Sequence, residues 1–227
     1  MISKLGIGSR TEAARWVREG RVRVNGKVVR DAEFPVMQGV DRILVDGQEP
    51  ASAARLVIML NKPRGLVTTV KDEHGRDTVY RCLDGAGLPW LAPVGRLDKA
   101  SEGLLLFSND PVWAARITNP ASGLDKQYHV QIDRLPDAAL LANLEHGVVI
   151  EGERLAAKAA QCLRTGERNA WLEIVLDEGR NRQIRRLLEA FDISVLRLVR
   201  VAVGSLSLGD LPKGRWRGLT QQETDSI

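Results

Sequence analysis

The stretch that decides the fold is Val94-Gly95-Arg96-Leu97-Asp98-Lys99-Ala100-Ser101-Glu102-Gly103-Leu104-Leu105-Leu106-Phe107-Ser108-Asn109-Asp110. Its apolar run, Leu104–Phe107, predicts a buried β-strand. A tight polar segment that contains Asp98 comes directly before this strand. A carboxylate at the entry to a rigid strand is held in a fixed position, which suits a nucleophile or a base.

The composition is that of an ordinary globular protein. The chain has 227 residues, of which 44% are hydrophobic and 27% are charged. No apolar run approaches the roughly 18 residues that span a bilayer, and the N-terminus has no apolar signal core. Cys82 and Cys162 lie far apart and form no Cys-x-x-Cys motif, which favours reduced thiols. We therefore expect a cytoplasmic protein without a membrane partner, and a monomer.

The positive charge is concentrated in two zones. Residues 10–30 hold seven Arg or Lys against two Glu, and residues 178–217 hold nine basic against four acidic residues. Arginine dominates both zones, and its planar guanidinium suits contacts to phosphates and bases. Two solvated helix faces would explain the same pattern, but we favour a surface for nucleic acid.

Residues 1–48 read as a small basic unit. Ser9-Arg10-Thr11-Glu12 is a capping box that predicts a helix ending near Gly20. Asn25-Gly26 between β-branched residues predicts a hairpin, and Ile43–Val45 a further strand. Residues 50–54 read as a linker, and we expect a second, larger domain over 55–227.

The larger domain mixes strands and helices without a regular βαβ rhythm, so we expect an α+β fold with a mainly antiparallel sheet flanked by helices. The expected strands are Leu56–Leu60, Leu66–Thr69, Leu104–Phe107, Tyr128–Ile132, Trp171–Leu176, Val195–Val201 and Val203–Leu208. The expected helices are one capped by Asp110, Pro136–Glu145 closed by Gly147, and the basic Asn181–Ala190.

Motifs for cofactor chemistry are missing from the sequence. It has no GxxxxGK[ST] loop, no GxGxxG loop and no GxSxG elbow. His74, His129 and His146 show no metal-ligand spacing. We expect neither a cofactor nor a metal, so any chemistry falls to carboxylates, arginines and a tyrosine.

Four segments, in order along the chain, resemble the motifs of the pseudouridine synthases. They are Lys62-Pro63-Arg64-Gly65, Gly95-Arg96-Leu97-Asp98 with Ser101-Glu102-Gly103-Leu104, Lys126-Gln127-Tyr128-His129-Val130, and Glu178-Gly179-Arg180-Asn181-Arg182-Gln183-Ile184-Arg185-Arg186-Leu187-Leu188. Residues 9–28 resemble the RNA-binding S4 domain. Only Ile2–Gly8 precedes the capping box, so we expect most of that domain's usual first helix to be missing. Together the resemblances indicate the RsuA/RluB type, which modifies ribosomal RNA.

The resemblance implies a role for five residues of the site. Asp98 would be the nucleophile, or a base that assists a glycal intermediate, and Arg185 would be its cationic partner. Tyr128 would stack on the uracil and place a phenol near the C5 proton, and Ile184 would form an apolar wall. Arg96 would fill the gap that the flipped base leaves in its helix.

Other basic side chains are expected to face the RNA. Lys62 could contact a phosphate or only brace the fold. The remaining candidates are Arg10, Arg15, Arg21, Arg23, Lys27, Arg180, Arg182 and Arg186.

The expected substrate is ribosomal RNA or a ribosome assembly intermediate. The segment Arg76–Tyr80 resembles the large-subunit enzymes more than the small-subunit one, so we expect a uridine of 23S RNA, with 16S RNA as the alternative. A non-catalytic assembly factor with the same fold is a second alternative. A glycosidase with an aspartate nucleophile lacks a convincing partner acid and leaves the basic zones unexplained.

Overall fold

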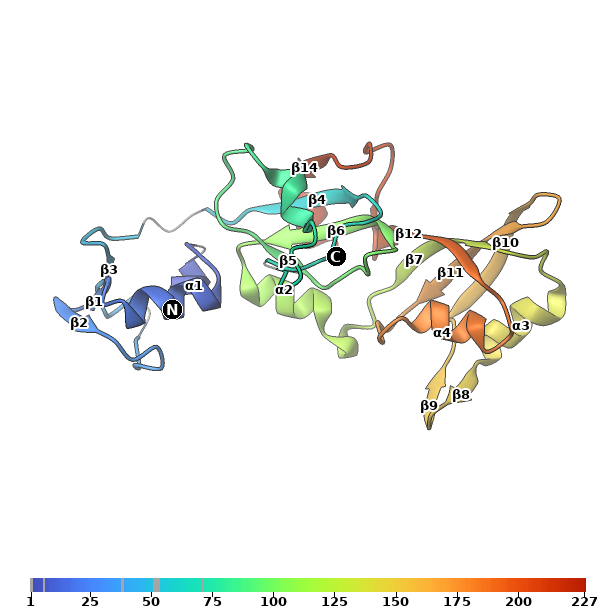
Figure 1. The fold of residues 1–227 in the computed structure, drawn as a ribbon, viewed down its shortest axis with the longest axis horizontal. Coiled ribbons are helices and arrows are strands. Elements are labelled where there is room, and N and C mark those ends of the chain that lie inside the picture. Colours follow the sequence, from blue (N-terminus) through green and yellow to red (C-terminus); the bar gives the residue numbers. More distant parts are fainter. Residues whose placement is uncertain (1, 6, 38, 51–53, 71) are drawn as a thin grey trace.

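The computed structural model describes residues 2–5, 7–37, 39–50, 54–70 and 72–227 of the chain. Figure 1 shows a small N-terminal unit, with α1 and β1 to β3, beside a larger body that holds the other labelled elements. Among the described residues, no helix is both long and apolar enough to cross a membrane.

The N-terminal unit is a helix packed on a three-stranded sheet. Its elements are η1 (Ile2–Leu5), α1 (Arg10–Arg18), β1 (Val22–Val24), β2 (Lys27–Val29) and β3 (Ile43–Val45), with the strand order β2-β1-β3. Both halves of the predicted capping box form, since the Ser9 side chain accepts from the Glu12 amide and Glu12 accepts from the Ser9 amide. The predicted hairpin is also confirmed, with φ values of 50° at Asn25 and 82° at Gly26.

This unit has a hydrophobic core of its own. Alternate residues of β1, Val22 and Val24, are buried, while Arg23 between them is exposed. Val17 of α1 and Ile43 of β3 close the same cluster. The basic side chain of Arg23 therefore projects outward from the hairpin.

The larger body is built on one nine-stranded sheet. Along the sheet the order is β10-β11-β7-β12-β6-β4-β14, with β13 paired to β12 and β5 paired to β6. The bounds are β4 (Val57–Lys62), β5 (Ala92–Val94), β6 (Glu102–Ser108), β7 (Lys126–Ile132), β10 (Ala159–Thr165), β11 (Ala170–Leu176), β12 (Val195–Val203), β13 (Leu206–Ser207) and β14 (Trp216–Gly218). Of its strand pairs only β12–β6 is parallel. A mixed, mainly antiparallel sheet was predicted, and it is confirmed.

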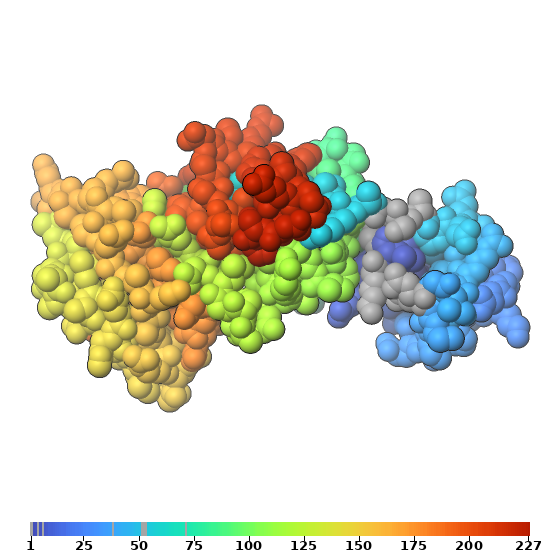
Figure 2. Space-filling view, turned by 180° about the vertical axis from the view of Figure 1, so that it is seen from behind, coloured from blue at the N-terminus to red at the C-terminus, as the bar shows by residue number. Residues whose placement is uncertain are grey.

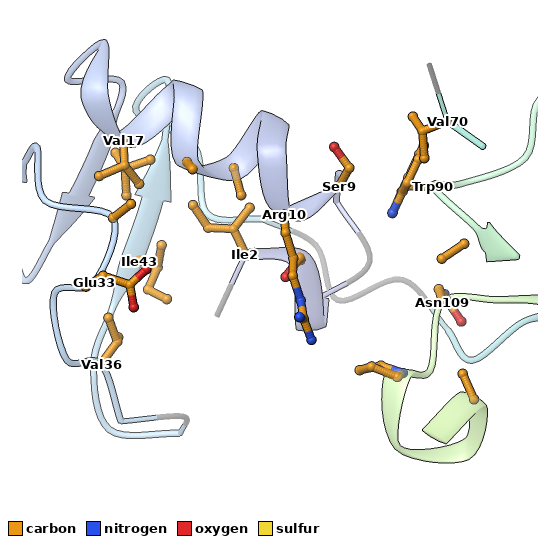
Figure 3. Close-up of a pocket in the computed structure, with 18 of the residues that line it drawn as sticks. Ile2, Ser9, Arg10, Val17, Glu33, Val36, Ile43, Val70, Trp90 and Asn109 are labelled. Carbon is orange, nitrogen blue, oxygen red and sulfur yellow. The ribbon is translucent and has the colours of Figure 1, made fainter. Parts of the chain in front are cut away.

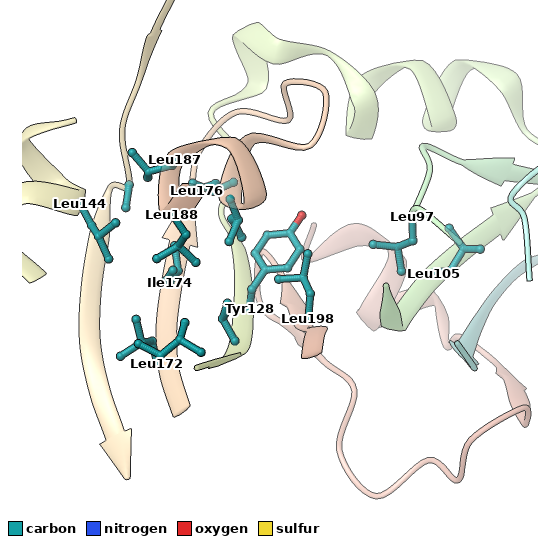
Figure 4. Close-up of a cluster of buried hydrophobic side chains, with 14 of the residues drawn as sticks. Leu97, Leu105, Tyr128, Leu144, Leu172, Ile174, Leu176, Leu187, Leu188 and Leu198 are labelled. Atoms are coloured by element: carbon teal, nitrogen blue, oxygen red, sulfur yellow. The ribbon is translucent and has the colours of Figure 1, made fainter. Parts of the chain in front are cut away.

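The other elements border this sheet. They are η2 (Val79–Leu83), α2 (Pro111–Thr118), η3 (Pro120–Ser122), α3 (Ala138–His146), the hairpin of β8 (Val148–Ile150) and β9 (Glu153–Leu155), α4 (Gln183–Glu189) and α5 (Gln221–Asp225). Leu144 of α3 and Leu187 of α4 pack with Leu172 of β11 in the largest core, which Figure 4 shows.

The centre of the sheet is buried on both faces. Leu105 and Phe107 of β6 belong to the core beneath α3 and α4, whereas Leu104 and Leu106 belong to a second core with Trp113 of α2. Burial on both sides explains why the predicted strand reads as a continuous apolar run rather than an alternation.

The C-terminal segment closes the second core. β14 pairs with β4, and the indole of Trp113 donates to the carbonyl of Thr224 in α5 across 3.1 Å. Figure 2 shows these last residues, in red, over the middle of one face of the molecule.

Several element predictions need correction. Leu66–Thr69 is not a strand but a turn region with one bridge, Val67 to Thr78, because the backbone of Val67 bonds only to the nearby residues Asp77 and Val79 and not to a strand of the sheet. The helices expected at Pro136 and Asn181 begin at Ala138 and Gln183, each directly after its N-cap residue. The two strands expected over 195–208 are one long strand, β12, followed by the short β13 after a turn at Gly204.

Candidate active site

Asp98 lies in the turn that leads into β6, and its carboxylate is accessible. The Ser101 amide donates to the Asp98 carbonyl across 2.9 Å, which closes the turn. The Asp98 side chain is 38% exposed, and its Oδ2 lies 3.7 Å from Nη1 of Arg182. The backbone of Asp98 is thus fixed, while the carboxylate faces open space with one cation nearby.

The backbone around Asp98 is fixed from below by Lys62, the last residue of β4. The Lys62 side chain is fully buried, and its Nζ donates to the carbonyls of Ser101 (2.8 Å), Asp98 (3.1 Å) and Pro63 (3.2 Å). Burial lowers the pKa of Lys62 to about 8, although Asp98 and Glu102 oppose that shift. The predicted contact of Lys62 with RNA is wrong, because a fully buried ammonium bonded to three carbonyls does not reach a phosphate. The alternative, that Lys62 braces the fold, fits its contacts.

The predicted ion pair between Asp98 and Arg185 is not formed; among the described residues Asp98 pairs with Arg182 instead. Arg185 uses its two Nη atoms to donate to the carbonyls of Ala100 and Val195, each across 3.3 Å. Its buried Nε has no hydrogen-bond partner. Burial and the neighbouring Arg182 lower the pKa of Arg185, and the nearby Asp98 raises it. Arg185 therefore supports the turn that holds Asp98 by a hydrogen bond to the main chain of Ala100, and its charge acts on Asp98 at longer range.

Asp98, Tyr128 and Ile184 line one cleft of about 630 Å³, although they are distant in sequence. This volume falls within the range of about 300–1,000 Å³ that is typical of ligand sites. Tyr128 and Ile184 are buried at 8% and 3% exposure and supply apolar surface. Figure 4 shows the Tyr128 ring beside Leu198, with the hydroxyl extending beyond the leucines. No described residue forms a hydrogen bond with this hydroxyl, and the hydroxyl oxygen is accessible to solvent.

The same cleft contains Arg96, Arg180 and Arg182, three of the predicted RNA-facing arginines. A neighbouring hollow of about 440 Å³ shares Asp98 and Arg96 with the cleft and is also lined by residues 67–69, 72–74 and 76. Asp98 thus lies between two hollows.

The basic side chains differ in whether they are already paired. Arg180 and Arg186 both bond Glu153, Arg21 bonds Asp46, and Arg15 lies 3.7 Å from Glu19. Four of the predicted RNA-facing residues have no carboxylate partner among the described residues: Arg10, Arg23, Lys27 and Arg96. These four are the freest to meet phosphates.

Glu102, at the end of the turn that holds Asp98, is a buried carboxylate for which the sequence predicted no role. Its side chain is 2% exposed, and Arg197 donates to both of its oxygens, across 3.0 and 3.1 Å. Lys213 also pairs with it. Burial opposes its ionisation, yet the hydrogen bonds from Arg197 and Lys213 hold the pKa of Glu102 below its ordinary value. This ion cluster ties β6 to β12 and to the C-terminal segment.

A larger hollow of about 810 Å³ lies at the N-terminal unit, and Asp98 does not line it (Figure 3). Ser9, the N-cap of α1, and Arg10 border it on one side, and Trp90 and Asn109 on the other. Trp90 stacks on Tyr80, with ring centroids 5.5 Å apart. Trp90 thus lies at the rim of this hollow.

Two further cations of the cleft that contains Asp98 were not predicted as site residues from the sequence. Arg200 of β12 and Lys126 of β7 line it. The available signal was an arginine inside the apolar run of Val195–Val203, where a charge is costly unless it serves a purpose.

The comparisons with known proteins agree over the whole chain. The sequence signature described as RNA pseudouridylate synthase matches residues 56–190, and that of the S4 domain matches residues 1–41. An uncharacterized RNA pseudouridine synthase of Aquifex aeolicus is 36% identical over 98% of this chain and 89% of its own length. The ribosomal large subunit pseudouridine synthase B of Bacillus subtilis is 34% identical over 100% of this chain and 93% of its own. A crystal structure of a pseudouridylate synthase superposes with a TM-score of 0.67 at 30% identity, covering 96% of this chain and 93% of that one.

Proposed function

This chain belongs to the RNA pseudouridine synthase family, and on that basis we propose that it isomerises a uridine of large-subunit ribosomal RNA with Asp98 as the reacting residue. The reaction breaks the bond from C1′ to N1 and forms one from C1′ to C5. N1 gains a proton and C5 loses one, so the process is balanced without a cofactor.

The convergence of Asp98, Tyr128 and Ile184 on one cleft carries the proposal. An accessible carboxylate can attack C1′, or remove a proton from the sugar to give a glycal, while apolar surface holds the detached uracil. Tyr128 offers the ring for stacking, and its unbonded hydroxyl is free to approach C5. Arg182, at 3.7 Å, places a positive charge beside the carboxylate of Asp98 that either route uses.

The choice of substrate rests on the relatives and on the N-terminal unit. The Bacillus subtilis relative is named for the large ribosomal subunit. We assign residues 1–48 to RNA binding and residues 55–227 to catalysis. Arg10, Arg23 and Lys27 are exposed on the N-terminal unit and have no carboxylate partner within the described part of the chain, which suits a phosphate backbone.

The test is release of tritium from ribosomal RNA labelled at uracil C5, because every turnover frees that proton. Wild-type protein should release tritium from 23S RNA, and Asp98→Asn should release none while it still binds the RNA. No release from either ribosomal RNA or from assembly intermediates would refute the enzymatic proposal. Release from 16S RNA alone would refute the large-subunit assignment.

A further inference from the structure

Arg200 is a buried arginine in the cleft that has no acidic partner. It is 7% exposed, and its Nε donates to the Leu104 carbonyl across 2.8 Å. Its Nη1 and Nη2 have no hydrogen-bond or ion-pair partner among the described residues. Both nitrogens are accessible to solvent. Since Arg200 lines the cleft, we take this accessible side to face the cleft. A guanidinium withdrawn from water normally satisfies its donors, and here the cleft side is left open.

Lys126 adds a second positive charge beside Arg200. It lines the same cleft, and its Nζ donates to the Leu124 carbonyl across 2.8 Å, which leaves two of its three donors free. Burial and the charge of Arg200 lower the pKa of Lys126, while the more distant Asp177, Asp125 and Glu178 raise it. Neither cation has a carboxylate within 4 Å among the described residues.

The acidic groups of the cleft are occupied elsewhere. Asp98 pairs with Arg182, and Glu178 accepts from Arg180 and from the amide of Gln183. Two like charges that are partly removed from water and left uncompensated form a site for an anion.

The strand register places this site next to the uracil position. Arg200 on β12 lies directly opposite Tyr128 on β7, and Lys126 lies two residues before Tyr128 on the same strand. Directly opposite residues have Cβ atoms about 5 Å apart, and residues two apart in a strand project to the same face. A phosphate held here would lie about one nucleotide's width from a base stacked on Tyr128.

We propose that Arg200 and Lys126 form a phosphate site in the cleft, which holds a backbone phosphate of the substrate RNA beside the target uridine. The assignment of RNA as the ligand rests on the proposed function. The anion site itself rests only on the two unpaired cations and their place in the cleft. Holding that phosphate would fix the sugar of the uridine relative to Asp98.

The first test needs no turnover. Wild-type protein is titrated with uridine 5′-monophosphate, uridine 3′-monophosphate and uridine, with binding followed by NMR. At least one monophosphate should bind about tenfold or more tightly than uridine, since charge-assisted hydrogen bonds form only with the phosphate. Lys126→Met should remove most of that preference and Lys126→Arg should keep it. Arg168→Met, which removes an exposed charge elsewhere, should leave it unchanged.

Equal affinity for uridine and both monophosphates would overturn the proposal, and so would an unchanged preference in Lys126→Met. Arg200→Lys keeps the charge and Arg200→Met removes it. The folding of both variants is compared with that of wild type by circular dichroism before binding is measured, because Arg200 also donates a hydrogen bond to the Leu104 carbonyl.

The second test measures how RNA binding depends on salt. With 23S RNA, the slope of log affinity against log salt should fall by about 0.7–0.9 in Lys126→Met, the value for one lost phosphate contact. It should not change in Arg168→Met. A slope that stays the same in Lys126→Met would contradict the RNA assignment. Absence of pseudouridine formation by wild type would refute the proposed function. The preference for a monophosphate over uridine would still show whether Arg200 and Lys126 form an anion site.

Discussion

Lys62 donates a hydrogen bond to the main-chain oxygen of Asp98, the residue whose side chain is the proposed nucleophile. The buried ammonium holds the main chain of the turn, while the carboxylate of the same turn is exposed and lines the cleft. Lys62 positions the reacting group without touching the substrate, and it does so with a charge that burial disfavours.

We predict that Lys62→Met lowers both stability and turnover. Three carbonyls lose their donor, which should cost about 2–4 kcal/mol of unfolding free energy. The turn that carries Asp98 loosens, so kcat should fall more than KM rises. Denaturant unfolding and single-turnover kinetics measure the two effects, and an unchanged kcat would show that Lys62 does not position Asp98.

The titration of Lys62 should make this difference depend on pH. The pKa is about 8 in the folded protein and about 10.5 for an unperturbed lysine. Between these values the unfolded chain binds more protons, so wild type should gain stability relative to Lys62→Met as the pH rises from 8 towards 10.5. The gain is about 3 kcal/mol at most. Unfolding curves of both proteins from pH 7 to 10 test the sign.

Arg185 and Arg182 should respond differently to substitution. Arg185→Gln removes bonds to the carbonyls of Ala100 and Val195 and should destabilise the protein by about 1–3 kcal/mol. Arg182 is 51% exposed and its contact with Asp98 is 3.7 Å long, so Arg182→Gln should change stability by less than about 0.5 kcal/mol. Turnover should fall in both. Equal losses of stability in the two variants would show that Arg182 is also structural.

Gly103→Ala should be among the most damaging single-methyl changes. A Cβ at Gly103, where φ is +100°, would lie 2.2 Å from the Arg200 carbonyl oxygen, so β6 and β12 would have to separate. We expect a loss of more than about 3 kcal/mol. Gly218→Ala in β14, where nothing lies within 4 Å and φ is not positive, is the matched control. Thermal unfolding of both variants tests the prediction, and it is wrong if they lose stability equally.

Glu102→Gln should destabilise the protein by about 1–3 kcal/mol, because the charge-assisted hydrogen bonds from Arg197 and Lys213 are weakened while both of these cations remain partly exposed to water. The pKa of Glu102 is lowered in the folded state, so its contribution is complete above the unfolded value near 4.5 and is lost as the pH falls through the folded value. Wild type and Glu102→Gln should therefore converge in stability at acidic pH. Parallel unfolding profiles from pH 7 to 3 would rule out this cluster as the cause.

Local signals predicted local structure well. The capping box at Ser9, the hairpin at Asn25-Gly26 and the cap at Asp110 each depend on a few adjacent residues, and each formed as predicted. The short strands β5, β8 and β9 and the exposed strand β10 carry little apolar periodicity, and the sequence did not reveal them.

Long-range contacts were harder to predict. The order of the motifs predicted that Asp98, Tyr128 and Ile184 share one site, and in the structure all three line the same cleft. Which arginine approaches Asp98 depends on the left-handed backbone of Arg182, whose φ is 50°. The burial of Lys62 depends on β4 lying beside β6. Neither relationship is local in the chain.

The parallel pairing of β12 with β6 has a consequence for synthesis of the protein on the ribosome. β12 lies between β7 and β6 in the sheet and joins them. Because β12 is near the end of the chain, the sheet and the cleft can form only after almost the whole chain has been synthesised. The N-terminal unit has its own core and sheet, and domains generally fold as units in the order of their synthesis. A nascent chain would therefore be able to bind RNA long before its catalytic cleft exists, so capture of RNA and its modification become separated in time.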